Sequence, residues 1–171
     1  MAEFVPYSDE NHRAQFLELN VEYLDYARTQ ESGLFKDKAA VRDYVERFLP
    51  KFTEVRPPEG IILILEVDDK VAGMGALKKL DEGVAEVKRM YIRPEYRGRG
   101  YGKEMLDRLI EKSKGFGLGA PDHFFDLCRR AGRRVLFGQF SLVSRRRPHG
   151  DRRYGADPGA ARGGLCRAAG Q

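Results

Sequence analysis

The chain has 171 residues, of which 42% are hydrophobic and 33% charged, and its formal net charge at pH 7 is +5. This length suits one domain with a sizeable hydrophobic core. No apolar run reaches the roughly 18 residues that a membrane-spanning helix needs, and the acidic opening residues Glu3, Asp9 and Glu10 are unlike a secretory signal.

A short strand and two helices are predicted first along the chain. The strand is expected over Glu3–Tyr7, and Ser8 or Asp9 can cap the helix that follows. Asp37 can cap a second helix, which we expect to end at Pro50. Apolar residues recur at helical spacing in both: Phe16, Leu17, Leu19, Tyr23, Leu24 and Ala27, then Ala40, Val41, Tyr44, Val45 and Phe48.

Three strands are then predicted to form an antiparallel meander. The first, Ile61–Val67, is almost continuously apolar, as in a central strand that is buried on both faces. In the second strand, Gly73 and Gly75 favour a bulge or the close approach of another element. The expected order is strand Ile61–Val67, turn Asp68-Asp69, strand Val71–Lys79, turn Asp81-Glu82-Gly83 and strand Val84–Ile92.

The segment after this last strand carries the strongest functional signal. Pro94 ends the strand because it cannot donate a ladder hydrogen bond. A basic loop with glycine at 98, 100 and 102 follows, and apolar residues then recur at helical spacing from Met105 to Ile110. A strand that feeds a glycine loop opening a helix aims several backbone N–H groups at one point, which is an arrangement for binding an anion.

Two common phosphate-binding loops do not fit this segment. A Walker loop needs G-x-x-x-x-G-K-[ST], and Glu104 stands where a hydroxyl residue would have to follow Lys103. The dinucleotide fingerprint G-x-G-x-x-G would need glycine at position 103 or 105, and these are Lys103 and Met105. The pattern that does fit is R-x-x-G-x-G, which begins at Arg97.

Residues 89–106, R-M-Y-I-R-P-E-Y-R-G-R-G-Y-G-K-x-M-L, resemble the acyl-CoA-binding motif of the GCN5-related N-acetyltransferase (GNAT) superfamily. The resemblance covers about residues 1–117. It implies an α/β (α+β) fold with a mixed, mainly antiparallel central sheet flanked by helices, and a C-terminal third that is irregular or incomplete. In such enzymes the fourth strand bulges and splays from the fifth, and acyl-CoA lies in the opening.

The resemblance implies acetyl-CoA as the co-substrate and no metal. Met90, Tyr91 and Ile92 would offer main-chain hydrogen bonds to the pantetheine amides and the acetyl carbonyl, although core packing is an alternative role for Met90 and Ile92. The loop would cradle the pyrophosphate. Its residues are Arg97, Gly98, Arg99, Gly100, Tyr101, Gly102 and Lys103.

The implied reaction is attack of a neutral amine on a thioester, which needs a base, an oxyanion donor and an acid for the thiolate. Glu86 is the candidate base, because several family members have a glutamate at this place that acts directly or through water. The alternative is a solvent-facing glutamate that pairs with Lys88 or Arg89. The oxyanion donor is expected to be a main-chain N–H near Met90 or Tyr91.

No acid is assigned. The family usually has a tyrosine within A-x-x-L-Y-x-x-x-G-F, which this chain lacks, and the residues around Tyr154 have no helical face. Tyr23, Tyr26 and Tyr44 can line the acceptor site from the first two helices, although aromatic residues at helical spacing more often belong to a core.

The composition changes abruptly near residue 117. Residues 1–117 hold 20 Lys and Arg against 22 Asp and Glu, whereas residues 118–171 hold 11 arginines and 4 aspartates, with only Arg133–Val143 favouring a strand. We therefore expect an acetyl-CoA-binding core at 1–117 and an Arg/Gly/Ala-rich tail at 118–171. The tail is interpreted either as translated out of frame and poorly folded, or as a natural segment that folds on RNA or an acidic partner.

Three functions fit these observations. The first is an N-acyltransferase that moves an acetyl group from acetyl-CoA to a primary amine of a small molecule or peptide by direct attack. The second is a non-catalytic CoA-binding module. The third is a basic nucleic-acid binder, and the acidic balance of residues 1–117 argues against this third function.

The expected partner is the amine acceptor. No membrane or nucleic-acid partner is expected, and a homodimer is allowed. Cys128 and Cys166 form no metal-ligand pattern with the three histidines, so a reduced, cytoplasmic setting is expected.

The out-of-frame interpretation makes a prediction about the gene. Beyond codon 117, one of the other two reading frames should encode an amphipathic helix that carries the L-Y-x-x-x-G-F signature. Sequencing the gene and translating both frames checks this. If neither frame encodes such a helix, the tail is the chain's own.

Overall fold

The structure is a computed structural model that describes residues 1–30, 35–118 and 142–145. Tyr154, both cysteines and positions 133–141 of the predicted strand lie outside the described residues. The elements follow the predicted order: β1 (Ala2–Pro6), α1 (Asp9–Gln30), α2 (Lys38–Thr53), β2 (Gly60–Val67), β3 (Lys70–Asp81), β4 (Val84–Ile92), the 3-10 turn η1 (Pro94–Tyr96), α3 (Tyr101–Gly115) and β5 (Leu142–Arg145).

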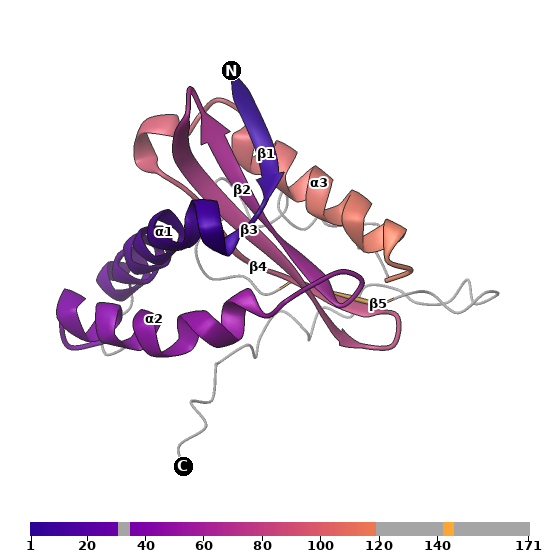
Figure 1. The fold of residues 1–171 in the computed structure, drawn as a ribbon, viewed down its shortest axis with the longest axis horizontal. Helices are drawn as coiled ribbons and strands as arrows, with labels where there is room; N and C mark the ends of the chain where they lie inside the picture. Colours follow the sequence, from indigo (N-terminus) through magenta and orange to yellow (C-terminus); the bar gives the residue numbers. More distant parts are fainter. Residues whose placement is uncertain (31–34, 119–141, 146–171) are drawn as a thin grey trace, which may run out of the picture.

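The strands form one sheet in the order of the sequence, β1-β2-β3-β4-β5, and each neighbouring pair is antiparallel. Helices α1 and α2 cover one face of this sheet, and α3 covers the other (Figure 1). The predicted fold class is therefore confirmed. No helix in the described part of the chain is both long and apolar enough to cross a membrane.

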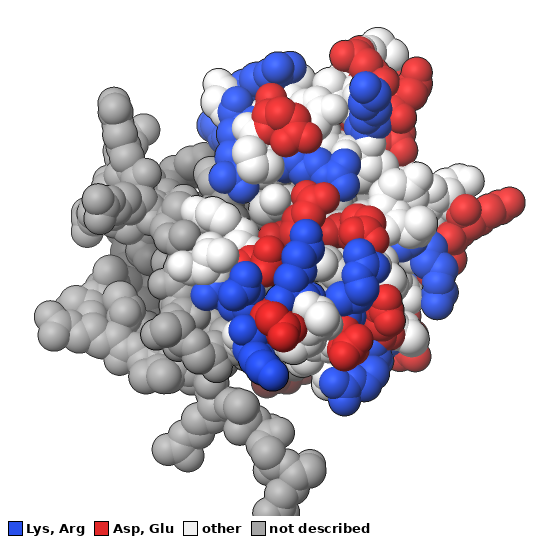
Figure 2. Space-filling view, turned by 90° about the vertical axis from the view of Figure 1, so that its left-hand side faces the viewer, with Lys and Arg blue, Asp and Glu red and all other residues white. Residues whose placement is uncertain are grey.

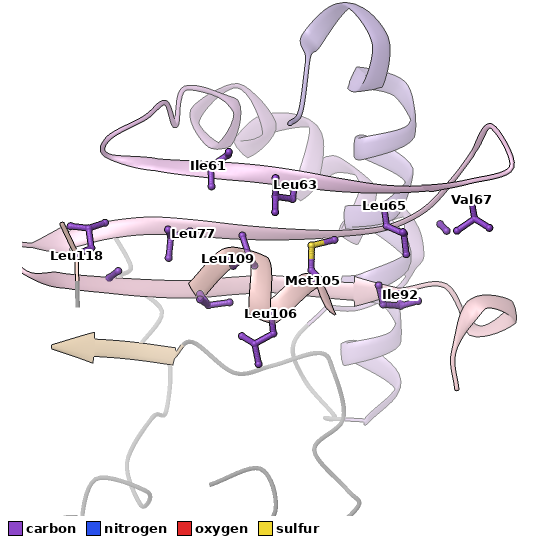
Figure 3. Close-up of a cluster of buried hydrophobic side chains, with 13 residues drawn as sticks. Ile61, Leu63, Leu65, Val67, Leu77, Ile92, Met105, Leu106, Leu109 and Leu118 are labelled. Carbon is purple, nitrogen blue, oxygen red and sulfur yellow. The ribbon is translucent and has the colours of Figure 1, made fainter. Parts of the chain in front are cut away.

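Strand β2 contributes side chains to the packed layers on both faces of the sheet. Ile61, Leu63 and Leu65 point toward α3, as Figure 3 shows, whereas Ile62 and Ile64 join the cluster under α1 and α2. All five side chains are at most 8% exposed. The continuous apolar run therefore reflects burial on both faces, as predicted, because successive residues of a strand face opposite sides.

The helices on the other face begin as the sequence predicts, but α2 ends later. The Oδ1 atom of Asp37 accepts a hydrogen bond from the N–H of Ala40 at 2.9 Å, which caps α2. The helix continues past Pro50 to Thr53, so the expected end at Pro50 is wrong. Pro50 lacks the N–H that would bond to the carbonyl of Glu46, but the residues after it keep their own N–H groups, so the last turn continues to Thr53. Phe48, expected on the inner face, is 43% exposed.

The two glycines of β3 allow other elements to come close, as predicted. A Cβ atom at Gly75 would lie 2.9 Å from Cγ of Met105 and 3.0 Å from Cδ1 of Leu109, both on α3. Figure 3 shows these two side chains directed at the sheet. At Gly73, a Cβ atom would lie 2.7 Å from the carbonyl oxygen of Tyr91 on β4. The absence of a side chain at 75 therefore sets how deeply α3 packs.

Strand β5 covers only part of β4. It pairs with Val84–Val87, and the strand predicted over 133–143 overlaps it only at Leu142 and Val143. The edge of β4 is therefore covered along its first half. Beyond Val87 no described residue pairs with that edge.

The substitution Gly75→Ala tests the packing of α3. The new methyl group would force Met105 and Leu109 to move, and we expect the free energy of unfolding to fall by about 1–3 kcal/mol. Gly115→Ala is the control, since a Cβ atom there meets nothing within 4 Å. Urea unfolding followed by circular dichroism gives both values. An unchanged midpoint for Gly75→Ala would contradict this packing.

Candidate functional site

The site begins at an irregularity in β4. Met74 pairs with Tyr91, but Ala76 pairs with Lys88, so two steps along β3 correspond to three steps along β4. The extra residue is a β-bulge opposite Gly75, and Arg89 within it has a φ of +52°, in the left-handed region. The bulge that the resemblance implies is therefore present, and its extra residue lies in β4.

The bulge changes which way the β4 side chains point. Val87 packs with the α3 layer, so regular alternation would place Arg89 on that face as well. Instead Arg89 contacts α1 and α2, while Met90 packs in the α3 layer and Tyr91 in the other. Lys88 and Arg89 consequently lie on the same face.

The glycine loop follows β4 directly. After η1, the N–H of Arg97 donates to the carbonyl of Pro94 at 3.2 Å, and the chain turns through Gly98 and Gly100, with φ of +78° and +84°. A Cβ atom at either glycine would meet nothing within 4 Å. These positions therefore need glycine for their backbone conformation, and the space beside them is open.

Three backbone N–H groups at the start of α3 are available to a ligand. Gly100 is the N-cap, and the N–H groups of Gly100, Tyr101 and Gly102 donate to no acceptor among the described residues. The first N–H groups of a helix have no partner within it, and the helix dipole adds partial positive charge at the same place. This donor set fits an anionic oxygen cluster such as a diphosphate.

The cationic side chains of the loop interact mainly with the protein. The Nε atom of Arg97 donates to the carbonyl of Ile92 at 2.8 Å, and its guanidinium lies 5.5 Å from the ring centre of Tyr26 and 5.6 Å from that of Tyr91. These contacts tie the loop to the end of β4 and to α1. The guanidinium of Arg99 lies 5.9 Å from the ring centre of Tyr96, a contact within the loop region. Lys103 pairs with Asp107 at 2.5 Å, one turn further along α3.

The three predicted main-chain ligands lie at the end of β4. Tyr91 and Ile92 are each 4% exposed, and Met90 is partly buried, so all three side chains pack in the core. For Met90 and Ile92, this packing is the role named as the alternative. Burial, followed by the charge of Glu22, raises the pKa of the Tyr91 hydroxyl. Tyr91 and Ile92 pair with Met74 and Gly73 of β3, and no described strand pairs with them on the other side.

Glu86 lies in the first half of β4, four residues before Met90. It is 8% exposed, and its carboxylate lies 2.5 Å from the Nζ atom of Lys88. The pairing named as the alternative role is therefore present, but the side chain does not face solvent. Four strand residues span roughly 13 Å, so a proton passing between Glu86 and a group near Met90 would need bridging water.

Sequence reasoning missed a group of residues around Arg89. Its Nη1 atom donates to Oδ1 of Asn20 on α1 at 2.6 Å, and its guanidinium lies 3.6 Å from the ring centre of Phe52 on α2. Burial lowers the pKa of Arg89, and no described carboxylate pairs with it. Strand periodicity could not reveal this group, because regular alternation predicts that Arg89 lies on the α3 face.

Phe52 also lines a pocket between α2 and strands β3 and β4. Its apolar walls include Phe48 and Val55, and Lys51, Lys78 and Lys88 lie around it. No acidic side chain is among the described residues that line it. Tyr23 and Tyr44, named as acceptor-site candidates, are partly buried against the α1/α2 core, which agrees with their core role.

Solved structures of acetyltransferases share this fold. An acetyltransferase of the GNAT family from Staphylococcus aureus Mu50 is 20% identical, with a TM-score of 0.52 over 76% of this chain and 79% of its own. A predicted acetyltransferase with acetyl-CoA from Clostridium acetobutylicum is 14% identical, with a TM-score of 0.52 over 83% and 96%. PaiA N-acetyltransferase from Thermoplasma acidophilum, in complex with coenzyme A, is 16% identical, with a TM-score of 0.57 over 85% and 99%.

No curated protein matches the chain. The family model described as the acetyltransferase (GNAT) family matches residues 16–125, which include most of α1 and all of α2, the meander, the glycine loop and α3. This range is more than half of the chain, and it contains the bulge and the donor set described above. The chain therefore belongs to the acetyltransferase (GNAT) family.

Proposed function

We propose that the chain is an N-acetyltransferase that moves the acetyl group of acetyl-CoA to a primary amine of a small molecule or peptide. One observation carries this proposal: the N–H groups of Gly100, Tyr101 and Gly102, which bond to no described acceptor, closely follow the end of β4, where the strand edge has no described neighbour. Coenzyme A has a diphosphate, which an anion site can bind, and an arm with amide groups, which an open strand edge can hydrogen-bond.

Within this proposal, residues 1–117 form the cofactor-binding core. The loop from Arg97 to Lys103 would hold the pyrophosphate, with glycine at 98, 100 and 102 letting the backbone approach it closely. The backbone of Met90, Tyr91 and Ile92 would bind the pantetheine amides and the acetyl carbonyl. The acetyl-CoA and coenzyme A in the two solved relatives support this choice of co-substrate.

The proposed chemistry is direct attack. The amine nitrogen forms a bond to the thioester carbonyl carbon, and a main-chain N–H near Met90 stabilises the oxyanion. The carbon–sulfur bond then breaks, and coenzyme A leaves as a thiolate that takes a proton. The proton that the nitrogen loses passes through water to Glu86, the proposed base. Lys88, 2.5 Å from this carboxylate, holds it in place on the α1/α2 face.

The described part of one face shows no clustered basic surface of the kind that nucleic-acid binding needs (Figure 2). Figure 2 shows Lys and Arg interspersed with Asp and Glu on the face to the left of Figure 1, without a broad area of one sign. Nucleic-acid binding depends on clustered basic residues that contact phosphates. The non-catalytic CoA-binding module stays an alternative that turnover measurements decide, and the homodimer and the cytoplasmic setting stay predictions.

The cofactor loop is tested with two matched substitutions. Gly100→Val and Gly117→Val both place a β-branched residue at a left-handed backbone position with open space around it, at opposite ends of α3. Both should lower stability to a similar extent. Only Gly100→Val should weaken acetyl-CoA binding, by about tenfold or more, in isothermal titration. Equal affinities for the two variants would remove the loop from the proposed site.

The proposed base is tested with Glu86→Gln. This change keeps the side chain's size but removes the proton acceptor, so kcat should fall by about 100-fold or more. The affinity for acetyl-CoA should stay within about threefold of wild type, since among the described residues Glu86 forms its ion pair with Lys88 and none with the loop. Initial rates of coenzyme A release report kcat. An unchanged kcat excludes Glu86 as the base, and no turnover in wild type with any amine favours the binding module.

A further inference from the structure

The guanidinium of Arg89 lies on the α1/α2 face and has no role in the acetyl transfer proposed above. A guanidinium has five N–H donors, and among the described residues only Asn20 accepts one of them. The side chain is partly exposed, so a ligand can reach it. Partial burial of a cation without an anionic partner costs free energy, and an anionic ligand would offset that cost.

Arg89 is also held in position. Asn20 is 1% exposed, and its Nδ2 atom donates to the carbonyl of Phe16 at 2.7 Å, which directs its Oδ1 atom toward the guanidinium. On α2, the ring of Phe52 stacks against the guanidinium. Two helices therefore orient the planar group, and such preorganisation reduces the entropy lost when it binds a ligand.

The surroundings are cationic as well. The nearest chain neighbour on the same face is Lys88, whose charge already pairs with Glu86. Phe52 connects Arg89 to the pocket that Lys51 and Lys78 border, and neither of these lysines has an ion-pair partner among the described residues. The local charge therefore favours an anion, and the apolar pocket walls favour a hydrocarbon part beside it.

We propose that the amine acceptor carries an oxyanion group, a carboxylate or a phosphate, which the guanidinium of Arg89 binds through its free N–H groups. This proposal rests on the acetyltransferase function above and names its acceptor class. Arg89 directly precedes Met90, the start of the segment proposed to hold the acetyl group. An anion at Arg89 would thus position the amine of the same molecule on the α1/α2 side of the thioester.

The test compares paired acceptors on the full chain with acetyl-CoA. Each anionic amine is paired with a neutral counterpart: amino acids with their amides, and aminoalkyl phosphates with the corresponding amino alcohols, each with short and long spacers. Coenzyme A release gives kcat/KM. Wild type should prefer the anionic member of at least one series by about 10- to 100-fold, and the preferred series identifies carboxylate or phosphate as the source.

Variants then locate the preference. Arg89→Gln should abolish it through a higher KM for the anionic member, leaving the neutral member and acetyl-CoA affinity unchanged. Arg89→Lys, which keeps the charge but loses the planar fork, should retain part of it. Arg47→Gln is the control for net charge, since Arg47 is exposed on α2 and bonds only to the carbonyl of Asp43 among the described residues.

Several outcomes would overturn the inference. If the wild-type chain acetylates neutral amines as fast as anionic ones, the proposed anion site is refuted, but the acetyltransferase function is not. This result does not depend on whether Arg89→Gln folds. A preference that survives Arg89→Gln, or that Arg47→Gln removes equally, places recognition elsewhere. If no amine in either series is acetylated although acetyl-CoA binds, the proposed function fails and the acceptor class fails with it.

Discussion

The extra residue in β4 opposite Gly75 is the constraint on which the rest of the site depends. It shifts the register between β3 and β4 by one, so that Arg89 joins Lys88 on the α1/α2 face and Met90 returns to the α3 face. On β3, the missing side chain at Gly75 admits Met105 and Leu109 of α3. One position thus sets both the direction of the β4 side chains and the depth of the helix whose first turn presents the free N–H groups.

The two faces of the sheet consequently supply different chemistry to one strand. On one side, the backbone of the glycine loop and the first turn of α3 offers donors without side chains, which suits a diphosphate. On the other side, α1 and α2 offer side chains, with Asn20 and Phe52 fixing the guanidinium of Arg89. The end of β4 lies between them, and its edge has no described neighbour beyond Val87. A thioester held there would be reached by an amine from the α1/α2 side.

Charge pairing separates structural cations from those that remain available. Arg97 bonds to the carbonyl of Ile92, Lys103 pairs with Asp107, and Arg93 forms a bidentate pair with Glu22 that ties β4 to α1. These contacts stiffen the loop and the strand end, because a bidentate arginine pair fixes direction as well as distance. Arg89 differs because, among the described residues, it bonds only to a neutral amide, that of Asn20. In the proposed function, the loop would therefore bind through its backbone, and Arg89 would offer a charged side chain to the acceptor.

The sequence alone determined the order of the elements, the bounds of most strands to within two residues and the place of the glycine loop. Strand β4 was predicted at Val84–Ile92 as observed, because its limits are marked by Gly83 and Pro94, and local signals of this kind act through a few neighbouring residues. The continuation of α2 past Pro50, the burial of Glu86 and the role of Arg89 were decided by tertiary structure. Periodicity assumes one residue per step in each paired strand, and an inserted residue becomes visible only when the partner strand shows which positions face each other.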